Sequence, residues 1–219
     1  MEKIEEQYCV STTEQLNGLF DPIGEASLTK ELSYIHPHYQ AFIEASPFAV
    51  LASGGTDGLD ISPRGDAPGF VVVHDIHTLL LPERRGNNRI DSLRNILVDP
   101  HIALLFLIPD VGETLRVNGQ ASISIEPALL QQFSMDGKLP KCVLIIKVEN
   151  VFFQCARAIK RAKLWQPSAD NSKPKLPSAG TILEALSNTK IDGENTIGIC
   201  PLDRPLRFIK FVDTTNRVT

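Results

Sequence analysis

The strongest constraint on the fold is a series of seven short apolar segments between residues 48 and 153, most of them separated by tight turns. The segments are rich in β-branched and aliphatic residues and are bounded by turn formers, which is the pattern of β-strands. They are residues 48–52, 59–62, 69–73, 78–81, 101–107, 115–125 and 142–153. Strands that follow one another through tight turns form an antiparallel sheet. The sequence therefore predicts a mainly β fold with peripheral helices, closed into a small barrel.

Short helices are expected around these strands, at residues 37–45, 89–97, 126–133 and 181–187. The second of them carries one apolar face, formed by Ile90, Leu93, Ile96 and Leu97. Residues 166–178 contain three prolines and are typical of an extended linker, and residues 198–212 are expected to form an edge strand or loop. We therefore expect an N-terminal helical extension at residues 1–46 and the barrel at residues 47–165. A linker and a C-terminal appendage packed on the barrel follow at residues 166–219.

Composition excludes several classes of protein. The 219 residues carry 26 acidic and 22 basic side chains, which gives a formal net charge of −4. A chain this acidic is a poor general binder of nucleic acid. The longest clear apolar run, residues 102–108, is far shorter than the ~18 residues of a membrane span, and the acidic start lacks the apolar core of a secretory signal. We therefore expect a cytoplasmic protein with neither nucleic acid nor a membrane as a partner.

The cysteines and histidines form neither a disulfide framework nor a metal-binding motif in the sequence. The four cysteines, Cys9, Cys142, Cys155 and Cys200, form no CxxC pair, so we interpret them as free thiols. The histidine pairs at residues 36–38 and 74–77 lack further ligands at a recognisable spacing, and no metal site is predicted. Phosphate-loop, dinucleotide and nucleophile-elbow motifs are also absent.

Two basic segments could bind an anion. Residues 82–89, Pro-Glu-Arg-Arg-Gly-Asn-Asn-Arg, join a predicted strand to a helix N-terminus, where free N–H groups and arginine side chains favour phosphate. The alternative is a charged, solvated turn. The second segment contains Arg157, Lys160, Arg161 and Lys163, followed by Trp165, the only tryptophan. It suits a flat anionic ligand, or else it is a solvated helix with the tryptophan in the core. Arg64, in Ser-Pro-Arg-Gly-Asp, could point at the same phosphate as Arg89.

In this order the segments resemble the pyridoxamine 5′-phosphate oxidase-like FMN-binding split-barrel proteins, roughly from residue 48 to residue 165. The likeness rests on the hairpin that ends in Ser-Pro-Arg-Gly-Asp, on Gly-Asn-Asn-Arg at residues 86–89, and on the Asp99-Pro100 helix stop. It continues through Leu-Arg-Val-Asn-Gly at residues 115–119 and through residues 155–165. It is nearest to the uncharacterised bacterial members that carry the first two motifs.

The resemblance implies a split β-barrel and a homodimer with FMN bound between the subunits. Arg64 and Arg89 match the positions that clamp the phosphate, and Asn88 stands where many relatives carry arginine, so Arg84 or Arg85 would compensate. The segment from Lys160 would approach the flavin. The cofactor-binding residues implied in this way are Arg64, Gly65, Pro82, Arg84, Arg85, Asn87, Asn88, Arg89, Lys160, Arg161 and Trp165.

The function implied is that of an FMN-dependent oxidoreductase that acts on a small-molecule substrate or electron donor, with no catalytic residue assigned. Residues 200–207 do not match the arginine-rich substrate motif of true pyridoxamine phosphate oxidases, which argues against that substrate. One alternative is a flavin-binding protein for storage, sensing or interaction. Another is a relative that binds haem or a deazaflavin on the same barrel.

Overall fold

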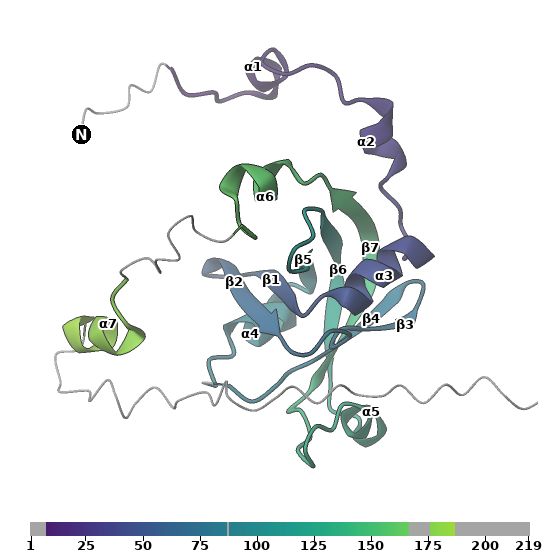
Figure 1. Cartoon of the computed structure of the whole chain (residues 1–219), viewed down its shortest axis with the longest axis vertical. Coiled ribbons are helices and arrows are strands. Elements are labelled where there is room, and N and C mark those ends of the chain that lie inside the picture. Colours follow the sequence, from purple (N-terminus) through teal and green to yellow (C-terminus); the bar gives the residue numbers. More distant parts are fainter. Residues whose placement is uncertain (1–7, 87, 167–175, 187–219) are drawn as a thin grey trace, which may run out of the picture. The chain divides into compact units, whose positions relative to one another are not determined.

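The computed structural model describes residues 8–86, 88–166 and 176–186, in a chain that divides into two compact units, residues 1–158 and 159–219. The first unit is built on one seven-stranded antiparallel sheet in the order β2-β1-β5-β6-β7-β4-β3 (Figure 1). The strands are β1 Phe48–Gly55, β2 Gly58–Gly65, β3 Val72–Asp75, β4 Thr78–Pro82, β5 His101–Leu107, β6 Thr114–Ser124 and β7 Val143–Gln154. All seven predicted strands are confirmed, and together they form the mainly β split barrel that was expected.

The barrel is split because β2 and β3 end the sheet. Each of these strands pairs with a single neighbour, β2 with β1 and β3 with β4. No ladder between the described residues of β2 and β3 closes the sheet. The two ends of the sheet must therefore be held together by side chains.

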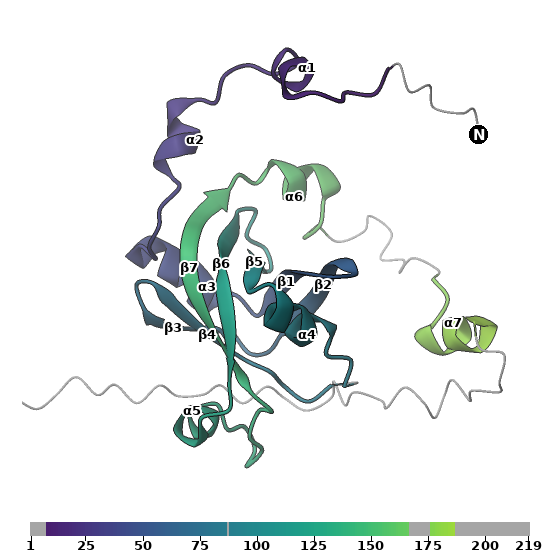
Figure 2. The same ribbon diagram turned by 180° about the vertical axis from the view of Figure 1, so that it is seen from behind.

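The helices are short and lie around the sheet. They are α1 Thr13–Asn17, α2 Glu25–Thr29, α3 Pro37–Ala45, α4 Asp91–Val98, α5 Pro127–Gln132, α6 Arg157–Ala162 and α7 Ala179–Leu186. Pro37 opens α3 as predicted, and the His36 ring accepts a hydrogen bond from the His38 N–H at 3.2 Å to cap it. Seen from behind, α4 lies beside the β1–β2 hairpin (Figure 2).

The core alternates along the central strands. Leu51 of β1, Leu104 of β5 and Val117 of β6 are fully buried, as a sheet with one buried face requires. Helix α3 covers part of this face with Tyr39 and Ile43. A smaller cluster, Leu80, Phe133 and Val143, lies beneath the partly buried leucines of α5.

Three local predictions were wrong. The third strand begins at Val72, not at residue 69, because Gly69 turns the chain with φ of +84° before Phe70 and Val71 enter the core. Helix α4 begins at Asp91, two residues later than expected. Of the predicted apolar face, Leu97 is 78% exposed and Ile90, at the N-cap, is 41% exposed, so only Leu93 and Ile96 pack against the core.

Cys9, Cys142 and Cys155 are free thiols, while Cys200 and the expected strand at residues 198–212 lie outside the described residues. The division of the chain at residues 46/47 and 165/166 stays a prediction. None of the described helices has the length and apolar character needed to cross a membrane.

We expect Gly119→Ala to destabilise the fold, because β6 and β7 approach closely at this point. The register of the β6–β7 ladder shifts between Asn118 and Gly119, and a Cβ on Gly119 would lie 2.1 Å from the Lys147 carbonyl oxygen. Relieving that clash requires the two backbones to separate, at a cost of ~1–3 kcal/mol in the free energy of unfolding. Urea unfolding measures this loss.

The control is Gly24→Ala, since a Cβ on Gly24 has no atom within 4 Å and its φ is −67°. It should leave the unfolding midpoint close to that of the wild type. Equal midpoints for all three proteins would contradict the close approach of β6 and β7.

Candidate functional site

Strand β2 has the reverse of the usual polarity. Its polar residues Asp60, Ser62 and Arg64 are half-buried, whereas Leu59 and Ile61, which alternate with them, are 93% and 69% exposed. Successive side chains of a strand point to opposite faces, so the three polar residues share one face. An edge strand that turns charge inward marks a polar site within the fold.

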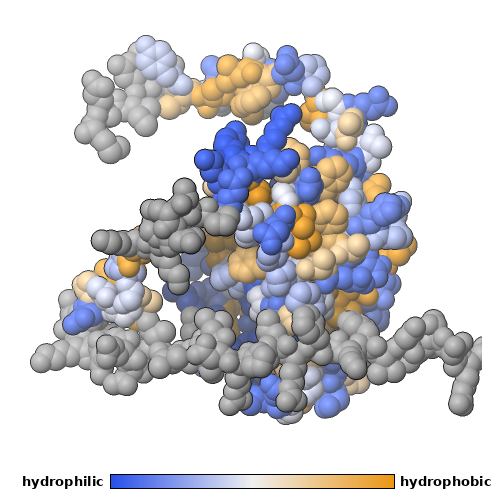
Figure 3. All heavy atoms as spheres, in the orientation of Figure 1, coloured by the Kyte–Doolittle hydropathy of each residue, from blue (hydrophilic) through white to orange (hydrophobic). Residues whose placement is uncertain are grey.

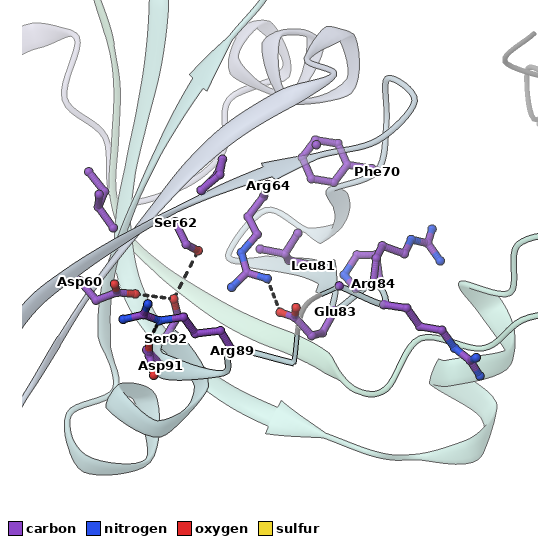
Figure 4. Close-up of a pocket in the computed structure, with 16 residues that line it drawn as sticks. Asp60, Ser62, Arg64, Phe70, Leu81, Glu83, Arg84, Arg89, Asp91 and Ser92 are labelled. Atoms are coloured by element: carbon purple, nitrogen blue, oxygen red, sulfur yellow. Dashed lines mark hydrogen bonds and ion pairs between the residues drawn. The ribbon is translucent and has the colours of Figure 1, made fainter. Parts of the chain in front are cut away.

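This polar face lines a cavity of about 450 Å³, within the range of ~300–1,000 Å³ typical of small-molecule sites. Strand β2, the end of β4 and the start of α4 surround it, together with the loop between β4 and α4 (Figure 4). Its lining combines four arginines with three carboxylates: Arg64, Arg84, Arg85 and Arg89 with Asp60, Glu83 and Asp91. Phe70 and Leu81 contribute an apolar wall.

Two ion pairs cross the split of the barrel. Arg64 of β2 donates from Nη1 to a carboxylate oxygen of Glu83, which directly follows β4 (Figure 4). Arg84, the next residue, donates from Nε to Oδ2 of Asp66 at 2.9 Å, just beyond β2. Because β2 and β4 lie toward opposite ends of the sheet order, these pairs join the two sides of the cavity.

Arg64 retains unused hydrogen-bonding capacity. Its side chain is only 16% exposed, and its Nε is buried without an acceptor among the described residues. A buried donor without an acceptor costs about 1–3 kcal/mol. An acceptor supplied by a bound ligand would satisfy this donor.

Hydrogen bonds connect the start of α4 to β2. Ser92 is 2% exposed, and its Oγ lies 2.8 Å from Oδ2 of Asp60 and 3.3 Å from Oγ of Ser62. Arg89 pairs with the Asp91 carboxylate, and its side chain is 79% exposed at the mouth of the cavity. The hydrogen bonds of Ser92 therefore fix the helix N-terminus, with Arg89 just before it, against the polar face of β2.

Cys142 lies near the crossing ion pair, and its carbonyl accepts from the Glu83 N–H at 2.9 Å. Burial, reinforced by the nearby Glu83 carboxylate and opposed by Arg64, raises the pKa of the Cys142 thiol. The thiol is thus protonated at neutral pH and is a poor nucleophile.

The structure brings most of the predicted site residues to this one cavity. Those that line it are Arg64, Gly65, Pro82, Arg84, Arg85 and Arg89. Asn88 has a left-handed backbone, with φ of 60°, and is not among the lining residues, while Asn87 lies outside the described residues.

The remaining predicted residues, Lys160, Arg161 and Trp165, belong to the second unit. Lys160 and Arg161 form the basic last turn of α6, over which hydrophilic side chains gather in Figure 3, and Trp165 is half-buried. Their place relative to the cavity stays a prediction.

Sequence reasoning missed several residues of the cavity. They are Asp60, Ser62, Phe70, Leu81, Glu83, Asp91 and Ser92. One signal was available, because Asp60 and Ser62 alternate with Leu59 and Ile61 along the strand predicted at residues 59–62. Glu83 and Asp91 had no such signal, since charged residues in a loop or a first helical turn are ordinary.

Fold and site together define a split-barrel protein with an arginine-lined cavity between its sheet ends. The family model of pyridoxamine 5′-phosphate oxidase matches residues 35–155, more than half of the chain. The protein therefore belongs to the pyridoxamine 5′-phosphate oxidase family. No curated protein matches the chain.

Solved structures of similar proteins cover about half of this chain. HupZ of Group A Streptococcus is 24% identical over 55% of this chain and 94% of its own, with a TM-score of 0.46. A candidate pyridoxamine 5′-phosphate oxidase of Lactobacillus delbrueckii is 20% identical over 56% and 98%, with a TM-score of 0.44. An FAD binding protein of Mycobacterium smegmatis is 13% identical over 55% and 95%, with a TM-score of 0.39.

We expect Arg84→Ala to lower the stability of the barrel. Besides its pair with Asp66, Arg84 donates from Nη1 to the Phe133 carbonyl at 2.6 Å, so it links the β4 loop to β2 and to the end of α5. Its loss leaves the half-buried Asp66 carboxylate without this partner, at a cost of ~1–3 kcal/mol in the free energy of unfolding. Chemical denaturation measures the change.

Arg85→Ala is the matched control, because Arg85 is exposed and no carboxylate pairs with it in the described part of the chain. Its effect should stay within ~0.5 kcal/mol. If both variants unfold at the same denaturant concentration, Arg84 does not link these elements.

Proposed function

We propose that this protein binds FMN in the cavity between β2 and α4 and acts as an FMN-dependent oxidoreductase on a small-molecule substrate or electron donor. The observation that carries the proposal is Arg64, a largely buried cation on β2 with a buried Nε that has no acceptor among the described residues. Phosphate oxygens are strong acceptors for arginine donors. Membership in the pyridoxamine 5′-phosphate oxidase family supports the choice of a flavin.

The residues present fit a phosphate group. Arg64 would hold it from the strand and Arg89 from the mouth of the cavity. Ile90, at the N-cap of α4, makes no side-chain cap hydrogen bond, so the first N–H groups of the helix are not used by a capping side chain. Free helix N–H groups and the helix dipole favour an anion.

The flavin, when bound, supplies the electron-transfer chemistry, so no protein acid–base group is required by the proposal. The chain's own residues bind and orient it. Arg64 and Arg89 fix the phosphate end, and Phe70 and Leu81 exclude water from one wall. Asp60, held by Ser92, is placed to accept hydrogen bonds from hydroxyl groups of a ligand.

Arg64→Ala should weaken FMN binding about 10- to 150-fold, the loss expected for one charge-assisted contact. Arg89→Ala should have a smaller effect, because its side chain is 79% exposed and already paired with Asp91. Riboflavin lacks the phosphate, so neither change should alter its binding much. Quenching of flavin fluorescence gives both affinities.

Arg94→Ala is the control, because it removes a 71% exposed arginine that also contacts Asp91 but does not line the cavity. Circular dichroism must show that each variant is folded. Folded Arg64→Ala protein that holds FMN as tightly as the wild type would defeat the assignment. Equal affinities of the wild type for FMN and riboflavin would do the same.

Glu83→Gln should tighten FMN binding several-fold. The Glu83 carboxylate competes with a phosphate for the Arg64 guanidinium, and the amide of glutamine keeps a hydrogen-bond acceptor without the charge. The same fluorescence titration measures the change. Weaker binding would mean that Glu83 positions Arg64 for the ligand instead of competing with it.

Spectra distinguish the alternatives from one another. A flavin gives a yellow protein with absorption maxima that haem does not share. Stopped-flow reduction by NADH or NADPH, followed by reoxidation with an acceptor, would support turnover. A flavin that binds tightly but is not reduced would favour a storage, sensing or interaction role.

We further propose a two-fold homodimer in which the partner subunit covers the apolar face of β2. The residues that carry this proposal are the exposed Leu59 and Ile61 on β2 and the exposed Leu97 and Val98 on α4. Isologous contact is the common way to cover such a face. Lys160, Arg161 and Trp165 would then approach the flavin of the partner.

Ile61→Lys should shift the protein toward monomer, because it places a charge in the middle of the proposed interface. Sedimentation velocity at micromolar concentration measures the change. The control is Ile76→Lys, on the exposed turn between β3 and β4, where Ile76 is 56% exposed. A wild type that sediments only as monomer would refute the dimer, without deciding whether FMN binds.

A further inference from the structure

A second cavity, of about 230 Å³, adjoins the first and shares Arg84 and Arg85 with it. It also contains Lys138 and the carboxylate of Asp136. In Figure 4, Arg84 extends away from the side of the main cavity where Arg64 and Arg89 lie. Arg64 and Arg89 thus line only the main cavity, whereas Arg84 and Arg85 line both cavities.

Rigid backbone builds this second cavity. Met135 and Lys138 exchange two backbone hydrogen bonds of 3.0 and 2.9 Å across a tight turn. Asp136 and Gly137 at its centre both have positive φ, 49° and 72°, as a type I′ turn requires. The backbone N–H of Lys141 donates to the Glu83 carbonyl at 3.1 Å, which holds this hairpin beside the Arg84–Arg85 loop.

The cations of the two regions differ in their pairing. Arg64, Arg84 and Arg89 each contact a carboxylate, whereas neither Arg85 nor Lys138 has one as an ion-pair partner within the described residues. Both side chains are exposed. Met135, Leu139 and Pro140 add an apolar surface beside them. Two cations without a carboxylate partner, next to an apolar surface, favour an organic phosphate.

We propose that Arg85 and Lys138 bind a second phosphate group, distinct from the 5′-phosphate of FMN, whose organic portion packs on Met135, Leu139 and Pro140. The inference rests on the proposed function, because it takes the main cavity to hold FMN. The phosphate could be the distal one of a dinucleotide such as FAD, or that of a separate phosphorylated substrate. In either case Arg85 serves the second site and not the FMN phosphate.

The test titrates inorganic pyrophosphate into FMN-loaded protein by calorimetry. The wild type should bind it, and Arg85→Ala and Lys138→Ala should each weaken binding about 3- to 10-fold, as for partly exposed phosphate contacts. FMN affinity should not change in Lys138→Ala, because Lys138 does not line the main cavity, and in Arg85→Ala it should fall less than pyrophosphate affinity. Lys141→Ala is the control, since it removes the same charge from an exposed lysine of the same hairpin that does not line the cavity.

Affinities for FAD identify the source of the phosphate. If the variants lose FAD affinity in parallel with pyrophosphate affinity, the ligand is a dinucleotide. If their FAD affinity is unchanged, the ligand is a separate phosphorylated molecule.

Three results would overturn the second site: no pyrophosphate binding by the wild type, an equal loss of pyrophosphate affinity in Lys141→Ala, or an equal loss of FMN affinity in Arg85→Ala. If the wild type fails to bind FMN, the proposed function falls. The second site is then judged from pyrophosphate titrations of the unloaded chain and the same variants.

Discussion

The pairing of Arg64 with Glu83 across the split is the interaction on which the rest of the site depends. The sheet ends at β2 and β3 without a closing ladder among the described residues, so its two sides are not joined there by backbone hydrogen bonds. Arg64–Glu83 and Asp66–Arg84 join these sides through side chains, and the cavity lies between them. Removing one partner of a largely buried pair leaves an uncompensated charge, so each pair stabilises the contact between the two sides of the sheet. The split of the barrel thus leaves an opening, and the side chains that bridge it place charges along the cavity wall.

The balance of charge within the cavity explains how it can be stable without a ligand and still bind an anion. Four arginines close together would repel one another, and Asp60, Glu83 and Asp91 offset that repulsion. A phosphate must then compete with carboxylates for donors, which lowers the gain from each contact. Among the described residues neither Arg85 nor Lys138 is held in an ion pair, although Asp136 also lines their cavity, and this difference in pairing separates the two regions of the site.

The polarity of β2 links the binding site to assembly. A strand alternates its side chains between two faces, so turning Asp60, Ser62 and Arg64 toward the cavity necessarily turns Leu59 and Ile61 to the outside. Exposing two large apolar side chains on an edge strand invites pairing with another surface. In our proposal, the polar face of β2 therefore contacts the ligand, and its apolar face contacts the partner subunit.

The sequence by itself determined the seven strands, because each carries a local pattern of apolar residues and turn formers. It also singled out Arg64 and Arg89, through their place beside a strand end and a helix start. It could not show that Glu83 faces Arg64, or that Leu97 is exposed. An ion pair between residues 64 and 83 depends on the order of strands in the sheet, and the exposure of one helix face depends on how much of the helix the sheet covers. Only the tertiary structure decided these points, since side chains from opposite ends of a sheet meet through its curvature, which no local pattern encodes.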